Sequence, residues 1–174
     1  FGINEKNLSS KDQVISAASC TTNCLAPIVH VLNNSFGIDK GFMTTIHSYT
    51  SDQPSQDRAG SSFRRSRSAA ENIIPNSNRS AEWIEKILPN LNGKIISSTL
   101  NVPVQFGSLL DLTTVMKKEN LTNKDIHSAI EDAEKEFPEL FKMVSDPIVS
   151  SDVCGMSQSI VFDQRGTLKI KNNM

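Results

Sequence analysis

The sequence predicts an α+β domain with a mixed, largely antiparallel sheet and helices packed on one face. Three observations favour this class. Strand-like stretches are numerous, helix-like stretches are few, and the two kinds do not alternate regularly along the chain. A length of 174 residues suits one hydrophobic core. We therefore expect a single domain over residues 1–174.

The first elements surround a serine- and threonine-rich turn. A short strand is expected over residues 13–16, entering a tight turn. Apolar residues then recur on one helical face until Gly37, which predicts a helix with Cys20 at its N-terminal end. Alternating apolar and polar residues predict a strand over residues 41–50, with His47 near its end.

The middle of the chain begins with a long polar loop, residues 51–62, of a length that usually serves a site or an interface. A short helix-like run follows to Ile74 and is closed by Pro75. Polar residues 76–80 offer caps for a second helix that stops within residues 89–93. Residues 94–102 and 104–117 are expected to form two strands.

The last third contains the clearest amphipathic helix. Thr122 and Asp125 form a helix-start signal of capping-box type, and apolar residues then recur to Phe137. Three further strands are expected over residues 147–153, 158–163 and 167–170.

Composition excludes several functions. The chain has 18 Lys and Arg against 19 Asp and Glu, so no general positive charge attracts nucleic acid or an anionic membrane. Its longest apolar runs fall far short of the roughly 20 residues that cross a bilayer. Three cysteines form no disulfide framework, which points to a location inside the cell. The three histidines are scattered, so no metal site is expected.

Cys20 is the strongest candidate for chemistry. At the first turn of a helix, unpaired backbone N–H groups and the positive end of the helix dipole stabilise a thiolate. His47 is the natural base for this thiol. On residue type alone, a buried structural cysteine is an equally open alternative for Cys20. A lone histidine on a strand is more often a structural residue, and nothing in the spacing shows that the two side chains meet.

Basic residues form a second candidate site. Arg58, Arg64, Arg65 and Arg67 lie within ten residues of one another. Guanidinium groups bind phosphate or carboxylate through two parallel hydrogen bonds. The cluster is either a phosphate pocket or a solvated face, while nucleic-acid binding is disfavoured because only Phe63 offers a stacking surface.

Two motifs carry a family resemblance. Residues 18–27 (Ala-Ser-Cys-Thr-Thr-Asn-Cys-Leu-Ala-Pro) resemble the active-site signature of phosphorylating glyceraldehyde-3-phosphate dehydrogenase. Residues 44–50 (Thr-Thr-Ile-His-Ser-Tyr-Thr) are similar to the family's catalytic-histidine strand. Further blocks at residues 72–75, 91–94, 111–113 and 149–152 match in the same order, so the resemblance covers nearly the whole chain.

The resemblance implies a glycolytic dehydrogenase. Cys20 would attack the aldehyde, hydride would pass to NAD, and inorganic phosphate would release the thioester as 1,3-bisphosphoglycerate. His47 would activate the thiol. By motif position, Thr50 would help hold the substrate phosphate, while Ser19, Thr21 and Arg65 would line the substrate and attacking-phosphate sites. The family also implies a cytoplasmic homotetramer, with residues 51–62 near the nicotinamide pocket and subunit interfaces.

Three departures from the family pattern fall at or near these sites. Asn101 stands where the family has an arginine before Val-Pro, which removes a guanidinium expected on the substrate phosphate. This change is expected to weaken phosphate binding by ~1–3 kcal/mol. Asn78 and Arg79 replace Thr-Gly beside the attacking-phosphate site, and Ala17 replaces a more usual Asn. We expect Arg79 to supply part of the charge that Asn101 lacks.

Further expectations concern what lies outside the chain. No Gly-x-Gly-x-x-Gly fingerprint is present, so NAD would be bound mainly by a Rossmann domain preceding Phe1, and no cofactor-binding residue is assigned here. The family's closing strand and C-terminal helix would follow Met174. The piece by itself is expected to be inactive.

Alternative functions remain open at this point. The chain is expected to act on glyceraldehyde 3-phosphate, or, as a divergent paralogue, on another aldehyde such as erythrose 4-phosphate. A thiol-based acyl transferase or hydrolase would use the same Cys-His pair without NAD. A non-catalytic binding module on the same fold is the third possibility.

Overall fold

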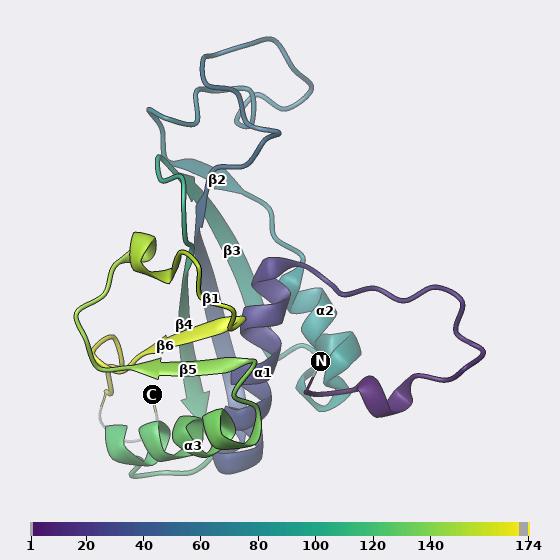
Figure 1. Cartoon of the computed structure of the whole chain (residues 1–174), viewed down its shortest axis with the longest axis vertical. Coiled ribbons are helices and arrows are strands. Elements are labelled where there is room, and N and C mark those ends of the chain that lie inside the picture. The colour runs from purple at the N-terminus through teal and green to yellow at the C-terminus, as the bar shows by residue number, and fades with distance from the viewer. Residues whose placement is uncertain (1, 171–173) are drawn as a thin grey trace.

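The computed structural model describes residues 2–170 and 174, and its elements form one main sheet with three helices on one side (Figure 1). The helices are α1 (Cys20–Phe36), α2 (Ser80–Ile87) and α3 (Asn123–Glu136). The main strands are β1 (Ile38–Ser48), β2 (Ile74–Asn76), β3 (Ile95–Val102) and β4 (Leu109–Met116). Short 3-10 helices occur at Glu5–Asn7, Pro89–Leu91 and Ser150–Val153.

The main sheet has the strand order β2-β3-β1-β4. The central pair, β1 and β3, is parallel, whereas β4 and β2 are antiparallel to their neighbours. A second, two-stranded parallel sheet joins β5 (Phe141–Val144) to β6 (Ile160–Asp163). The predicted α+β class with a mixed, largely antiparallel sheet is confirmed.

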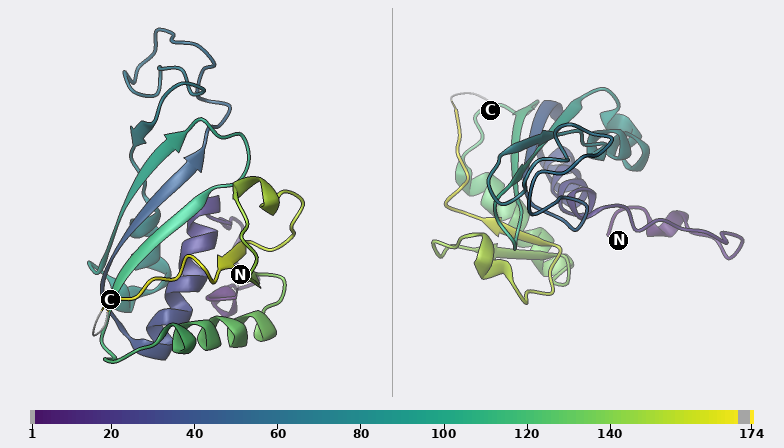
Figure 2. Two further views of the ribbon diagram at one scale, coloured as in Figure 1. Left: turned by 90° about the vertical axis from the view of Figure 1, so that its left-hand side faces the viewer. Right: turned by 90° about the horizontal axis from the view of Figure 1, so that it is seen from above.

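The two faces of the main sheet have different environments. Met43, Ile95 and Met116 are buried in the core beneath the helices. Phe42, Ile96 and Leu109 alternate with inward-facing neighbours and are exposed on the outer face. Figure 2 shows the helices gathered on one side of the sheet. The predicted placement of helices on one face is therefore confirmed.

Helix α1 begins and ends at residues that suit those positions. The Ser19 side chain accepts a hydrogen bond from the Thr22 N–H at 3.2 Å, which satisfies one of the first-turn donors. At the other end Gly37 has φ 68°, a conformation that glycine adopts without steric cost. The predicted helix with Cys20 at its start is confirmed.

Two expectations in the first half of the chain are wrong. Residues 13–16 form no strand but lie in an exposed extended arm, where Val14 is 91% exposed, because no neighbouring strand supplies hydrogen bonds. The helix-like run before Pro75 is a turn, and Ile74 starts strand β2 instead. Pro75 is tolerated there because β2 is the edge strand of the sheet.

The last third differs from expectation in its short strands. The strand predicted over residues 158–163 is present as β6, but Ser150–Val153 is a 3-10 helix and residues 167–170 have no regular structure. Strand β5 was not predicted, because it has only four residues directly after α3 and pairs with a segment far along the chain. Periodicity cannot reveal so short a strand.

The predicted capping box of α3 is confirmed. The Asp125 N–H donates to Thr122 Oγ1 at 3.2 Å, while the Asp125 carboxylate accepts from the Thr122 N–H at 2.7 Å. Two first-turn donors are thereby satisfied reciprocally, with Asp in place of the more usual Glu.

Thr122→Ala is expected to lower the free energy of unfolding by about 1 kcal/mol, because the first turn of α3 loses its side-chain acceptor. Urea unfolding followed by circular dichroism measures this change. The control, Glu131→Ala on the exposed side of the same helix, should alter stability by less than about 0.5 kcal/mol. Equal effects of the two changes would contradict a specific role for the cap.

Candidate active site

The candidate site lies where the start of α1 meets the end of β1. The Cys20 sulfur lies 3.3 Å from His47 Nε2, although the two residues are 27 positions apart in the sequence. Cys20 is exposed, so its sulfur is open to a small molecule, whereas His47 is partly buried. The structure therefore brings together the two residues that sequence alone left unconnected.

The His47 ring is held by the backbone of its own strand. Its Nδ1 lies 2.7 Å from the carbonyl oxygen of Ser48. Because a carbonyl can only accept, Nδ1 carries a proton and donates this hydrogen bond. The second nitrogen, Nε2, is therefore left to exchange a proton with Cys20.

The electrostatics of the pair favour a thiolate. The hydrogen bond to His47 is the largest cause that lowers the pKa of Cys20 to about 7, and hydrogen bonds from Thr21 add to it, while partial burial opposes it. The same contact raises the pKa of His47 above its ordinary value. The proton on this pair is thus shared near neutral pH, which suits a nucleophile activated by a base.

Cys24 behaves differently although it lies only one helical turn away. Burial, with a smaller contribution from Cys20, raises the pKa of its thiol to about 11. Its side chain packs against the hydrophobic core. Cys24 is therefore a packing residue, in agreement with its place beside Leu25 in the apolar pattern.

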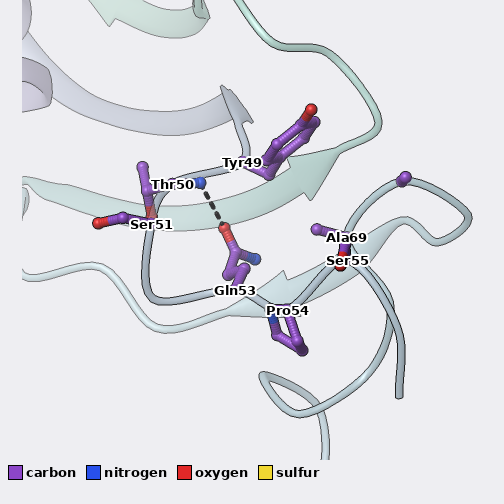
Figure 3. Close-up of a pocket in the computed structure, with 8 residues that line it drawn as sticks. Tyr49, Thr50, Ser51, Gln53, Pro54, Ser55 and Ala69 are labelled. Atoms are coloured by element: carbon purple, nitrogen blue, oxygen red, sulfur yellow. Dashed lines mark hydrogen bonds between the residues drawn. The ribbon is translucent and has the colours of Figure 1, made fainter. Parts of the chain in front are cut away.

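Thr50, Asp52 and Arg65 form a connected polar group beyond the end of β1. The Thr50 hydroxyl donates to the Asp52 carboxylate, and the same carboxylate forms an ion pair with Arg65. Thr50 is exposed, and its backbone N–H donates to Gln53 Oε1 at 3.0 Å (Figure 3). Asp52 belongs to none of the sequence motifs. The signal for it is its spacing two residues after Thr50, in a loop that also supplies arginines.

Two cavities flank this loop. One, of about 230 Å³, is lined by Tyr49, Thr50, Gln53 and neighbouring small residues (Figure 3). The other, of about 700 Å³, lies between the segment containing Arg64 and Arg65 and the segment 75–77. The arginine cluster is thus partly beside a cavity. It is also partly paired, because Arg67 binds Asp57 at 2.7 Å in addition to the Arg65–Asp52 pair.

The positions that depart from the family pattern have distinct surroundings. Asn78 bridges elements: its Oδ1 accepts from the Ser80 N–H at 2.6 Å, and its Nδ2 donates to Thr45 Oγ1 at 3.4 Å. Arg79 is exposed and forms an ion pair with Glu82 at 2.8 Å. Asn101 is only 6% exposed and lies beside His47 in the parallel register of β1 and β3.

Ser19 and Thr21 flank the nucleophile. The Ser19 hydroxyl contacts the Thr22 hydroxyl at 2.9 Å and caps α1, so its oxygen is committed mainly to the helix start. Thr21 acts on the Cys20 sulfur through hydrogen bonds from its backbone N–H and its side chain, which lower the pKa of that thiol. Both therefore lie in the immediate neighbourhood of the candidate nucleophile.

Residues 2–170 and 174, which the structure describes, were compared with the requirements of a metal site and of a membrane-spanning helix. Within them, no group of three or more His, Cys, Asp or Glu side chains is arranged to hold a metal ion. None of the helices in this part of the chain has the length and apolar character needed to span a membrane.

Comparison with known proteins shows the family of this chain. The family model for the glyceraldehyde 3-phosphate dehydrogenase C-terminal domain matches residues 19–174. Glyceraldehyde-3-phosphate dehydrogenase of Borreliella burgdorferi is 44% identical over 175 residues, covering 99% of this chain and 52% of the relative.

Two clostridial proteins with the same name are similarly related. The protein of Clostridium pasteurianum is 48% identical and that of Clostridium acetobutylicum is 46% identical, each over 166 residues. Each alignment covers 94% of this chain and 48% of the relative, so the chain spans about half the length of the curated relatives it matches. Because the family model matches residues 19–174, the chain belongs to the glyceraldehyde 3-phosphate dehydrogenase C-terminal domain family.

Proposed function

We propose that this chain is the catalytic domain of a phosphorylating glyceraldehyde-3-phosphate dehydrogenase and that Cys20 is its nucleophile. The observation that carries the proposal is the 3.3 Å contact between the Cys20 sulfur and His47 Nε2 at the start of α1. The relatives bearing this name, with 44–48% identity, support the reaction. NAD would be bound mainly by a second domain of the longer protein.

The reaction begins with transfer of the thiol proton from Cys20 to His47. The thiolate forms a bond to the aldehyde carbon, and the carbonyl oxygen takes up the proton from His47 Nε2 to give a hemithioacetal. The positive end of the α1 dipole stabilises the negative charge that passes from sulfur to oxygen during this step.

In the next step His47 accepts a proton instead of donating one. NAD, when bound, would supply the hydride acceptor for oxidation of the hemithioacetal carbon. In that oxidation His47 Nε2 takes up the hydroxyl proton, and the carbon is left as a thioester carbonyl bonded to Cys20. Inorganic phosphate attacks this carbonyl, the bond to sulfur breaks, and the acyl phosphate leaves while Cys20 returns to the thiolate. The exposure of Cys20 leaves its sulfur accessible to both reactants.

We assign the binding of the substrate phosphate and of the attacking inorganic phosphate to polar residues around the Cys20–His47 pair. Thr50 is proposed to contact the substrate phosphate, and Ser19, Thr21 and Arg65 the substrate and attacking-phosphate sites. Asp52 holds both the Thr50 hydroxyl and the Arg65 guanidinium, so it fixes their relative positions. Asn78 and Arg79, which lie at and beside the start of α2, border the attacking-phosphate site in this proposal.

The longer protein is proposed to be a cytoplasmic homotetramer. The outer face of the main sheet exposes Phe42, Ile96 and Leu109, and the loop after β1 exposes Phe63 to 93%. Apolar side chains exposed in this way are usually covered by another chain or domain. The three cysteines are all free, which suits a reducing compartment.

A divergent paralogue acting on another aldehyde, such as erythrose 4-phosphate, is the second candidate. The observation that favours it is Asn101, a neutral and buried amide at a position where the resemblance implies a phosphate-binding arginine. A substrate with a different chain length places its phosphate differently, so it would depend less on a cation at this point.

NADH formation by the full-length protein tests the proposal and separates the two candidates. The substrates are glyceraldehyde 3-phosphate, erythrose 4-phosphate and unphosphorylated glyceraldehyde, each with and without inorganic phosphate. We expect the fastest turnover with glyceraldehyde 3-phosphate, dependent on added phosphate and abolished by Cys20→Ser but not by Cys154→Ser. A preference for another aldehyde would favour the paralogue, and a folded protein with no turnover would contradict both.

Alkylation of Cys20 by iodoacetamide should follow a pKa of about 7, because His47 stabilises the thiolate. The thiolate is the reactive form, so the rate should rise with pH through this value. His47→Ala should move the midpoint up toward the ordinary value of 9.0 and slow alkylation at pH 7 by about tenfold. Peptide-resolved mass spectrometry separates Cys20 from Cys154. An unchanged midpoint in His47→Ala would contradict the proposed pair.

Arg79 provides a further prediction. If its charge compensates for Asn101, Arg79→Ala should raise the KM for inorganic phosphate by about tenfold through loss of a charge-assisted contact. Its ion pair with Glu82 offers a matched control, since Glu82→Gln removes the partner and keeps the guanidinium. Phosphate and substrate dependence in Arg79→Ala that matched the parent protein would exclude this compensation.

A further inference from the structure

The carbonyl oxygen of Ser48 receives hydrogen bonds from two side chains. His47 Nδ1 donates to it at 2.7 Å, and Asn101 Nδ2 donates to it at 3.4 Å. These donors come from neighbouring parallel strands, where His47 and Asn101 are register partners. The atom that fixes the His47 ring is therefore itself held by Asn101.

The Asn101 amide is oriented by a third strand. Its Oδ1 accepts a hydrogen bond from Asn76 Nδ2 at 3.1 Å, and Asn76 lies on the edge strand β2. Because the oxygen of the amide faces Asn76, its nitrogen is directed toward Ser48. A chain of hydrogen bonds thus runs from β2 through β3 to β1 and ends at the His47 ring.

The surroundings of Asn101 differ from those expected of a residue that binds phosphate. Asn101 is 6% exposed, and both ends of its amide are engaged within the protein. Removing a partner from such a buried group leaves other polar atoms unsatisfied, so the network holds a defined geometry. A flexible contact to an incoming anion would instead require an exposed or unengaged donor.

We propose that Asn101 is a positioning residue, which orients the Ser48 carbonyl and through it the His47 ring so that Nε2 faces Cys20. This inference rests on the proposed function, because it assigns Asn101 a task in the Cys20–His47 pair. It replaces the role in substrate-phosphate binding that the family pattern implies for position 101. Asn76 has the supporting task of keeping the Asn101 amide in its orientation.

Loss of the Asn101 amide should alter the alignment of the Cys20–His47 pair. The hydrogen bonds of the Asn101 amide go to Asn76 and Ser48 rather than to the sulfur or the imidazole, so its loss should leave both reacting groups present but less well aligned. Cys20 is the titratable group that acts on His47 in this structure. Poorer alignment should therefore weaken the main interaction that lowers the pKa of Cys20, whereas loss of a phosphate ligand would leave that pKa unchanged.

The experiment compares four forms of the full-length protein: wild type, Asn101→Leu, Asn76→Ala and Ser98→Ala. Leucine keeps the approximate size of asparagine without its amide. Asn76→Ala removes the group that orients Asn101 and lies on a partly exposed edge strand, so it serves if Asn101→Leu does not fold. Ser98→Ala is the matched control, because Ser98 bonds Thr44 between the same two strands at 3.2 Å on the outer face.

Two readouts are measured: the pH dependence of Cys20 alkylation, and kcat and KM for the aldehyde and for inorganic phosphate. Asn101→Leu should slow alkylation at pH 7 by roughly threefold to tenfold, with the difference vanishing above the ordinary thiol pKa. It should lower kcat while both KM values stay within about twofold. Asn76→Ala should show the same pattern to a smaller extent, and Ser98→Ala should match the wild type.

The outcomes separate this inference from the proposed function. A low pKa in the wild type that neither Asn101→Leu nor Asn76→Ala changes would overturn the inference alone. A rise in the KM for phosphate or for the aldehyde with an unchanged alkylation profile would also overturn the inference. That result would favour a role of Asn101 in phosphate binding. A wild-type Cys20 with an ordinary thiol pKa would overturn the proposed function and this inference together.

Discussion

The hydrogen bond between Cys20 and His47 is the interaction on which the candidate site depends. It joins the first residue of a helix to the penultimate residue of a strand, so it requires both elements to end at defined positions. The Ser19 cap sets the start of α1. The backbone pairing of β1 with β3 and β4 sets the end of β1. The contact between the Cys20 thiol and His47 therefore depends on the cap of α1 and on the register of β1.

The end of the sheet nearest the site is polar on its buried face. Thr45, Thr99 and Asn101 replace the apolar residues that occupy the same face further along the strands. Burying such groups costs free energy unless their hydrogen bonds are satisfied. Here Asn101 is engaged with neighbouring strands, and Thr45 accepts a bond from Asn78. The hydrogen bonds of these buried polar side chains keep a defined geometry at this end of the sheet, where fewer apolar side chains are buried.

Local sequence signals predicted the parts of the fold that local interactions determine. The bounds of α1 and the capping box of α3 depend on residues within one helical turn, so they were visible in the sequence. Strand β5 and the edge strand β2 depend on partners far along the chain, and they were missed. The same division applies to the site. Cys20 and His47 were identified from motifs, whereas the contact of Asn101 with Ser48 needed the strand register.

We propose that His47 and Cys20 share a proton as a coupled pair. Nitrogen-15 NMR of the His47 ring, recorded across pH before and after alkylation of Cys20, measures this most directly. We expect the pKa of His47 to lie above its ordinary value and to fall when the sulfur is blocked, with Nδ1 protonated throughout. A His47 whose pKa is the ordinary one and does not change when Cys20 is alkylated would contradict the coupled pair.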